Sequence, residues 1–154
     1  MNLFLIRHAH ALGADEDPAR PLSPRGREQV LSLAEFLERS GVFQPAEFWH
    51  SALVRSRQTA ELLARRLRLA APLALIPDLE PEASPKTVVR RIRAATHAIA
   101  VVGHEPHLSA LATLLVAGKA EPPAFVMKKC SALALEGIDA FWSVRWHVSP
   151  DLIV

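Results

Sequence analysis

The first apolar segment of the chain ends in an arginine and a histidine, and it constrains the fold more than any other feature. Leu3 to Ile6 are apolar, and Arg7 and His8 follow them directly. A short apolar run of this kind predicts a buried strand. Open α/β sheets bind ligands just beyond the carboxyl ends of their strands, so the sequence predicts a ligand site that begins at Arg7. A guanidinium is a fixed cation that matches phosphate oxygens, and an imidazole can act as a nucleophile, a base or a metal ligand.

A second apolar run, over residues 98–102, has the same form and ends in Gly103-His104. One helix should begin at Pro24, with Ser23 as its N-cap, and end at Gly41. The remaining patterns predict helices over residues 53–67, 85–97 and 106–116, short strands over 48–49 and 74–76, and a hairpin of residues 131–135 and 141–146. Alternating strands and helices predict an α/β fold, with a mostly parallel central sheet, helices on both faces and hairpin-like strands at the C-terminus.

Length and composition narrow the class of protein. The chain has 154 residues, which fits a single compact domain over residues 1–154. Its net charge of +2 does not indicate a nucleic-acid partner, and no apolar run approaches the roughly 18 residues of a membrane span. No charged leader precedes an apolar stretch, and the single cysteine, Cys130, cannot form an intramolecular disulfide. The cytoplasm is therefore the expected location, with no membrane partner, and Cys130 is expected to be a packed thiol.

Four segments follow one another along the chain in a recognisable order. They are Arg7-His8-Ala9-His10-Ala11, Arg20-Pro21-Leu22-Ser23-Pro24-Arg25-Gly26, the segment from Ser51 to Ala60, and Gly103-His104-Glu105-Pro106. In this order they resemble the motifs of the histidine phosphatase superfamily, which has the phosphoglycerate-mutase-like fold. The short length of the chain and the residues of its motifs are most similar to the short branch of this superfamily, the SixA-type phosphohistidine phosphatases. The resemblance extends from Leu3 to about Trp146.

The resemblance implies a phosphatase that forms a covalent phosphohistidine intermediate and uses no cofactor. It assigns the nucleophile to His8, which fits because an imidazole with a pKa of about 6.5 is largely neutral at pH 7. It assigns phosphoryl binding to Arg7 and Arg55, and Arg55 should lie in the first turn of its helix near free N–H groups. It places His104 opposite the nucleophile, where a charged ring would stabilise the transition state. Arg20 matches an arginine that reaches the mouth of the site or fixes its loop.

Two positions depart from the family pattern. Ala9 stands where glycine is common, so the turn must tolerate a Cβ atom. Larger members use a glutamate as general acid, and here the corresponding segment offers Asp78, Glu80 and Glu82 without a clear match. A phosphohistidine substrate would need little acid help, because its imidazole leaving group is easily protonated. The loops over residues 12–21 and 78–85 are too short to form a large lid, which favours an open site and a phosphorylated protein as the substrate.

Three other functions stay open on the sequence alone. A broad phosphomonoesterase of the same fold would act on a small phosphorylated substrate. A metal-dependent phosphohydrolase would use the pairs His8-x-His10 and His104-x-x-His107, although no carboxylates stand beside them at ligand spacing. A non-catalytic module would bind phosphate without turnover, although Arg7, His8, Arg55 and His104 are all present.

Overall fold

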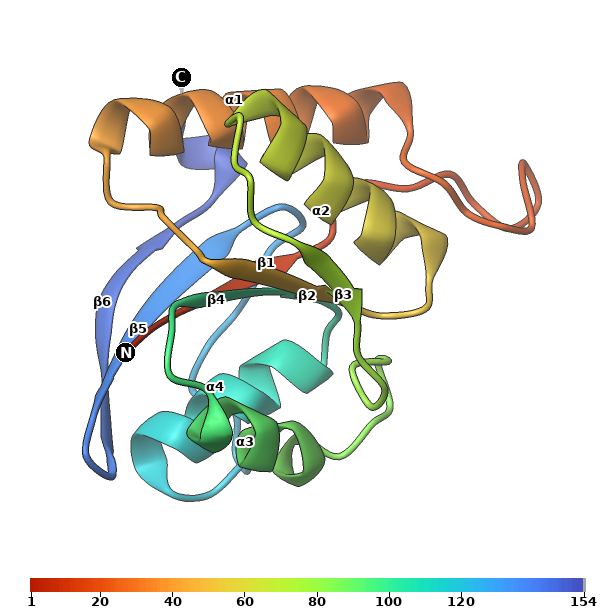
Figure 1. Cartoon of the computed structure of the whole chain (residues 1–154). Coiled ribbons are helices and arrows are strands. Elements are labelled where there is room, and N and C mark those ends of the chain that lie inside the picture. Colours follow the sequence, from red (N-terminus) through yellow and green to blue (C-terminus); the bar gives the residue numbers. More distant parts are fainter. Residues whose placement is uncertain (154) are drawn as a thin grey trace.

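The strands predicted from the two apolar runs lie side by side in the sheet (Figure 1). The computed structural model describes residues 1–153, and its six-stranded sheet has the order β3-β2-β4-β1-β5-β6. The strands are β1 (Asn2–Arg7), β2 (Glu47–His50), β3 (Leu73–Leu75), β4 (Ile99–Gly103), β5 (Ala132–Ile138) and β6 (Phe141–Val148). The first four are parallel, whereas β5 is antiparallel to β1 and forms a hairpin with β6. The predicted α/β class, with its mostly parallel sheet and C-terminal hairpin, is confirmed.

Two pairs of helices cover the two faces of the sheet, as predicted. One face carries α1 (Pro24–Ser40) and α2 (Val54–Arg66), and the other carries α3 (Pro85–Ala94) and α4 (His107–Ala117) (Figure 1). Side chains alternate along β1, so that Phe4 and Ile6 enter one core while Leu3 and Leu5 enter the other. Burial on both faces explains why β1 is an unbroken apolar run. Within residues 1–153, no helix has the length and apolar character needed to cross a membrane.

Local signals in the sequence set both ends of α1. Ser23 Oγ accepts a hydrogen bond from the Gly26 N–H at 3.0 Å, and Pro24 occupies the first helical position. Gly41 follows the helix with a φ of 68°, a left-handed conformation that glycine adopts without strain. The N-cap and the stop predicted from the sequence are therefore both confirmed.

The predicted end of the third helix is wrong. The spacing predicted a helix over residues 85–97, but α3 stops at Ala94 and Ala95 is already extended. Because β4 begins at Ile99, the chain must leave the helix early enough to enter the sheet. A short 3₁₀ helix, η1 (Pro150–Leu152), follows β6 and was not predicted.

Candidate functional site

The carboxyl ends of β1, β4 and β2 are neighbours in the sheet, and a polar side chain follows each of them. β4 lies between β1 and β2 and is parallel to both. His8 follows β1, His104 follows β4 and Ser51 follows β2, and all three side chains are buried. The ring centroids of His8 and His104 are 5.1 Å apart, and the ring planes meet at 51°. The structure thus brings together the two histidines that the sequence singled out.

One hydrogen bond sets the orientation and the tautomer of His8. Its Nδ1 lies 2.7 Å from the carbonyl oxygen of Ala9. A carbonyl oxygen can only accept, so Nδ1 carries the hydrogen and Nε2 carries the lone pair of the neutral ring. The backbone of Ala9 does not enter the positive-φ region, which explains why alanine is tolerated where glycine was expected. The free Nε2 is therefore the atom of His8 that can attack an electrophile.

Ser51 orients His104 in a comparable way. Ser51 Oγ lies 2.7 Å from His104 Nε2 and accepts a hydrogen bond from the Leu53 N–H at 3.2 Å. Its own hydrogen is available to His104 Nε2, and in the tautomer that accepts it Nδ1 carries the ring hydrogen. His104 Nδ1 is buried and has no hydrogen-bond partner within the described chain. A buried donor of this kind needs an acceptor, and a phosphoryl oxygen would supply one.

Two hydroxyl groups of α2 hold the strand ends in place. Thr59 Oγ1 accepts a hydrogen bond from the Ala9 N–H at 3.1 Å and donates to the Arg55 carbonyl at 2.8 Å. Ser56 Oγ accepts from the Ser51 N–H at 3.0 Å and donates to the Val102 carbonyl at 2.7 Å. These contacts fix the first turn of α2 against the ends of all three strands. No pattern in the sequence indicated that Ser51, Ser56 and Thr59 act together.

The two arginines predicted to bind phosphate both present unsatisfied donors. Arg7 donates from Nη1 to the Met127 carbonyl at 2.9 Å, but its Nε is buried without a partner among residues 1–153. Arg55 Nε is also buried without a partner there. Burial lowers the pKa of both guanidinium groups, and at Arg7 the carboxylate of Glu105 opposes this shift. Half-buried guanidinium groups, each with a buried Nε–H that lacks a partner, form a site for an anion.

Arg57 and Arg20 lie outside this pair. Arg57 forms an ion pair with Glu61 at 3.5 Å, and its side chain is 51% exposed. Arg20 donates from Nε to the Leu12 carbonyl at 3.0 Å, so it fixes its loop. Its charge also lowers the pKa of Arg55, which puts Arg20 near the mouth of the site. Both roles considered for Arg20 are therefore compatible with its position.

The electrostatic surroundings keep both site histidines neutral at pH 7. Burial lowers the pKa of His8 to about 4, helped by the charges of Arg55, Arg7 and Lys129 and opposed by the hydrogen bond to Ala9. Burial lowers the pKa of His104 to about 3, and His8 and Arg55 contribute to the same shift. A neutral His8 suits a nucleophile. The charged His104 implied by the family resemblance is not its state in the free protein, because burial and the neighbouring cations disfavour the charged ring.

The three acidic residues considered as proton donors do not lie beside the two site histidines. The charges of Asp78 and Glu80 act on His107, at the start of α4, while Glu82 lies on the same loop after β3. Glu105 lies nearer, since its charge acts on Arg7. Its carboxylate accepts hydrogen bonds from both the N–H and the hydroxyl of Ser109. No acidic residue of the described chain is among the charges that act on His8, so the general acid stays unassigned.

In the pair His8-x-His10, which was considered as a pair of metal ligands, one ring nitrogen of each histidine is already hydrogen-bonded. His8 Nδ1 bonds to Ala9, and His10 Nδ1 lies 2.6 Å from Ser23 Oγ. Across residues 1–153, no group of three or more His, Cys, Asp or Glu side chains is arranged to hold a metal ion. The donor set thus gives no support to the metal-dependent alternative. Cys130 is fully buried, and burial raises the pKa of its thiol, so it is a packed thiol as predicted.

Both site histidines should titrate well below the ordinary imidazole pKa of about 6.5 in the free protein. We expect midpoints near 4 for His8 and 3 for His104, because burial and the two arginines disfavour the charged rings. NMR titration of the ring signals would measure this, with each signal identified by its loss in His8→Ala or His104→Ala. Saturating inorganic phosphate should raise both values, since its charge offsets the arginines. Midpoints at the ordinary value in the free protein would contradict this description.

Comparisons with known proteins identify the family and the fold of the chain. A family model described as the histidine phosphatase superfamily (branch 1) matches residues 3–80. No curated protein matches the chain. The protein histidine phosphatase SixA complexed with tungstate has the same fold, with a TM-score of 0.87, 24% identity and 98% of each chain covered. The α-ribazole phosphatase of Shigella flexneri also shares the fold, with a TM-score of 0.78, 22% identity and 97% of each chain covered. A mycobacterial glucosyl-3-phosphoglycerate phosphatase has a TM-score of 0.71 and 18% identity, with 94% of this chain and 96% of that chain covered.

Proposed function

The chain belongs to the histidine phosphatase superfamily, and from this premise we propose that it hydrolyses phosphohistidine on a protein through a covalent intermediate on His8. The family match also confirms the resemblance seen in the four sequence motifs. One observation carries the proposal. The bond from His8 Nδ1 to the Ala9 carbonyl leaves the Nε2 lone pair free, next to two arginines whose charges act on the ring. A neutral nucleophile beside fixed cations is what phosphoryl transfer requires.

In the first step, His8 Nε2 attacks the phosphorus atom. The Nε2–P bond forms while the P–N bond to the substrate imidazole breaks, and the leaving ring keeps the electron pair and takes a proton from water. Arg7 and Arg55 oppose the charge on the phosphoryl oxygens. In the second step, water attacks phosphorus and the Nε2–P bond breaks, with its electron pair returning to a neutral His8. Both protons of this water leave on the phosphate, and one of them then neutralises the hydroxide produced in the first step.

His104 gains its role when the phosphoryl group binds. Its Nδ1–H, which lacks a partner in the described chain, would donate to a phosphoryl oxygen. The negative charge of the bound group raises the pKa of His104, opposite to the effect of the arginines in the empty site. Ser51 holds the ring in position through Nε2 throughout. His104 would then be neutral in the free protein and would favour its charged form once the phosphoryl group is bound. Its charge would therefore stabilise the site with the transferred group bound more than it stabilises the free protein.

Two features favour phosphohistidine over other phosphoryl donors. Among residues 1–153, no acidic side chain is among the charges that act on His8, so the leaving group should be one that departs easily, and an imidazole fits. The loops beside the site are short, which fits a large substrate that reaches the site from outside. The fold alone does not decide, because SixA and the α-ribazole phosphatase share it. A broad phosphomonoesterase is therefore the second candidate.

A parallel assay of a phosphohistidine protein and an unactivated phosphomonoester would test the substrate class. We expect kcat/KM to be higher for the phosphohistidine protein by at least about 10²-fold, or 2.7 kcal/mol of transition-state discrimination. Phosphohistidine also hydrolyses without an enzyme, so the rate with His8→Ala should be subtracted. Similar rates on both substrates would indicate the broad phosphomonoesterase. Tight phosphate binding without turnover of either substrate would indicate a non-catalytic module.

A further inference from the structure

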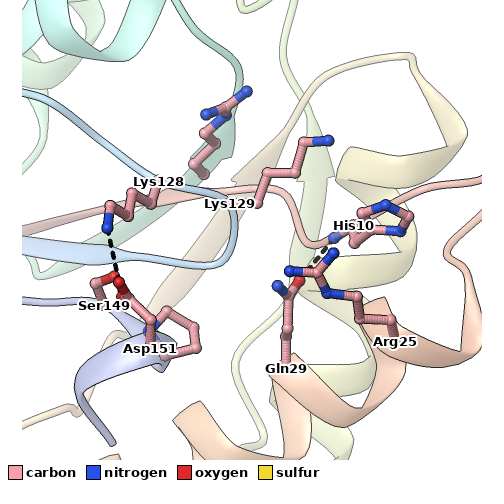
Figure 2. Close-up of a pocket in the computed structure, with 9 residues that line it drawn as sticks. His10, Arg25, Gln29, Lys128, Lys129, Ser149 and Asp151 are labelled. Atoms are coloured by element: carbon pink, nitrogen blue, oxygen red, sulfur yellow. Dashed lines mark hydrogen bonds and ion pairs between the residues drawn. The ribbon is translucent and has the colours of Figure 1, made fainter.

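We propose that a pocket beside the site binds a second anionic group of the substrate, a carboxylate or phosphate carried next to the phosphoryl group that is removed. This inference rests on the proposed function, because it specifies the substrate of the same site. The pocket has a volume of about 520 Å³. It is lined by Arg7, His10, Arg25, Gln29, Lys128, Lys129 and the segment Ser149-Pro150-Asp151 (Figure 2).

The pocket continues directly from the catalytic centre. Arg7 lines it and also holds the Met127 carbonyl, which fixes the segment that leads into Lys128 and Lys129. On the other side of Lys129, the Cys130 N–H donates to the carbonyl oxygens of Arg7 and His8 at 3.0 and 3.1 Å. The backbone thus holds Lys129 beside His8, and its charge acts on the His8 ring. A substrate with its phosphoryl group at His8 would place an adjacent group in this pocket.

The positive charge in the pocket lacks matching negative charge. Asp151 is the only acidic residue in the lining, and Lys128 pairs with it at 2.7 Å while the Ser149 hydroxyl also donates to it. Within residues 1–153, Arg25 and Lys129 form no ion pair at all. The pKa of Lys129 is lowered by burial and then by four arginines, the first of them Arg7. An anion would relieve this repulsion between cations.

The neutral groups of the pocket also favour an acceptor. Gln29 Oε1 accepts a hydrogen bond from the His10 N–H at 2.8 Å, so the amide NH₂ of Gln29 is the end left to donate. Figure 2 shows Lys129 between the Lys128–Asp151 pair on one side and Gln29 and Arg25 on the other. The loop after β1, the first turns of α1 and the segment before β5 all contribute. Donors from these three segments match a carboxylate or a second phosphate. They disfavour a substrate whose group next to the phosphoryl group is uncharged.

Binding to a catalytically inactive protein tests the pocket separately from turnover. In the His8→Ala background, we would measure Kd for two phosphohistidine peptides. One carries glutamate next to the phosphohistidine, and the other carries glutamine there. A second pair would be phenyl phosphate with and without a ring carboxylate. The acidic member of at least one pair should bind about fivefold more tightly at low salt, and less so at high salt. Preference in the peptide pair indicates a protein carboxylate, and preference in the aryl pair alone indicates a small diacid.

Arg25→Gln should abolish this preference and leave Kd for the neutral members unchanged. Arg27→Gln is the matched control, because it removes the same charge from an exposed position of the same helix that does not line the pocket. Equal Kd values within both pairs would overturn the inference. So would equal effects of Arg25→Gln and Arg27→Gln, which would show a general field rather than a pocket. If the wild-type protein showed no turnover of phosphohistidine, the proposed function would be overturned, whereas these binding outcomes would not change.

Discussion

Replacing His8 with alanine should abolish turnover, with a loss of at least about 10⁴-fold in kcat, because the Nε2 lone pair that attacks phosphorus is removed. Brief exposure of the wild-type protein to a phosphorylated substrate, followed by quenching, should leave phosphate on His8. The adduct should be a phosphoramidate, which is labile in acid and stable in alkali. Mass spectrometry of the quenched protein would locate it. The reason is the free Nε2 lone pair, fixed by the bond from Nδ1 to the Ala9 carbonyl.

His97→Ala is a suitable control for this experiment. His97 lies at the surface, where its Nε2 is 3.0 Å from Glu47 and its side chain is 48% exposed. Its replacement should leave both labelling and turnover unchanged. Circular dichroism and thermal unfolding would show whether His8→Ala keeps the fold. Label found on Ser51, Ser109 or Cys130 would contradict the assignment, since each of these buried side chains carries a hydroxyl or a thiol that could accept a phosphoryl group.

The ends of β1 and β4 were predictable because each carries its own signal in the sequence. An unbroken apolar run marks a strand that is buried on both faces, and the polar residue that follows it marks the carboxyl edge. Since both strands are parallel, His8 and His104 had to lie at the same edge of the sheet. The Ser23-Pro24 start of α1 was predictable for a similar reason, because its cap depends only on neighbouring residues.

Other parts of the site could not be predicted, because they depend on contacts between distant segments. Ser51 meets His104 across 53 positions, and Thr59 meets Ala9 across 50. Lys129 reaches His8 only because Cys130 bonds to the backbone at the end of β1. Hydroxyl groups and lysines at such positions look like ordinary surface or helix residues in the sequence. The pattern of charges that makes His104 neutral depends on the same meeting of segments.

Replacing either arginine of the site should cost on the order of 10²-fold or more in kcat/KM, comparable to the removal of one charge-stabilising donor in other enzymes. Arg55→Ala is the cleaner test, because Arg7 also supports the Met127 carbonyl and could affect the fold when removed. Arg55→Lys should recover only part of the loss, since lysine keeps the charge but not the planar pair of donors. Steady-state kinetics on one substrate at one pH would give all three values.

Arg57→Ala provides the matched comparison for Arg55→Ala. Arg57 is on the same helix, about 200° around the axis from Arg55. It is paired with Glu61 at the surface, whereas Arg55 keeps a buried Nε without a partner in the described chain. Loss of a surface ion pair should change kcat/KM by less than about fivefold. If Arg57→Ala were as damaging as Arg55→Ala, then α2 would present a different face to the substrate. Phosphoryl binding would then have to be assigned to another set of donors.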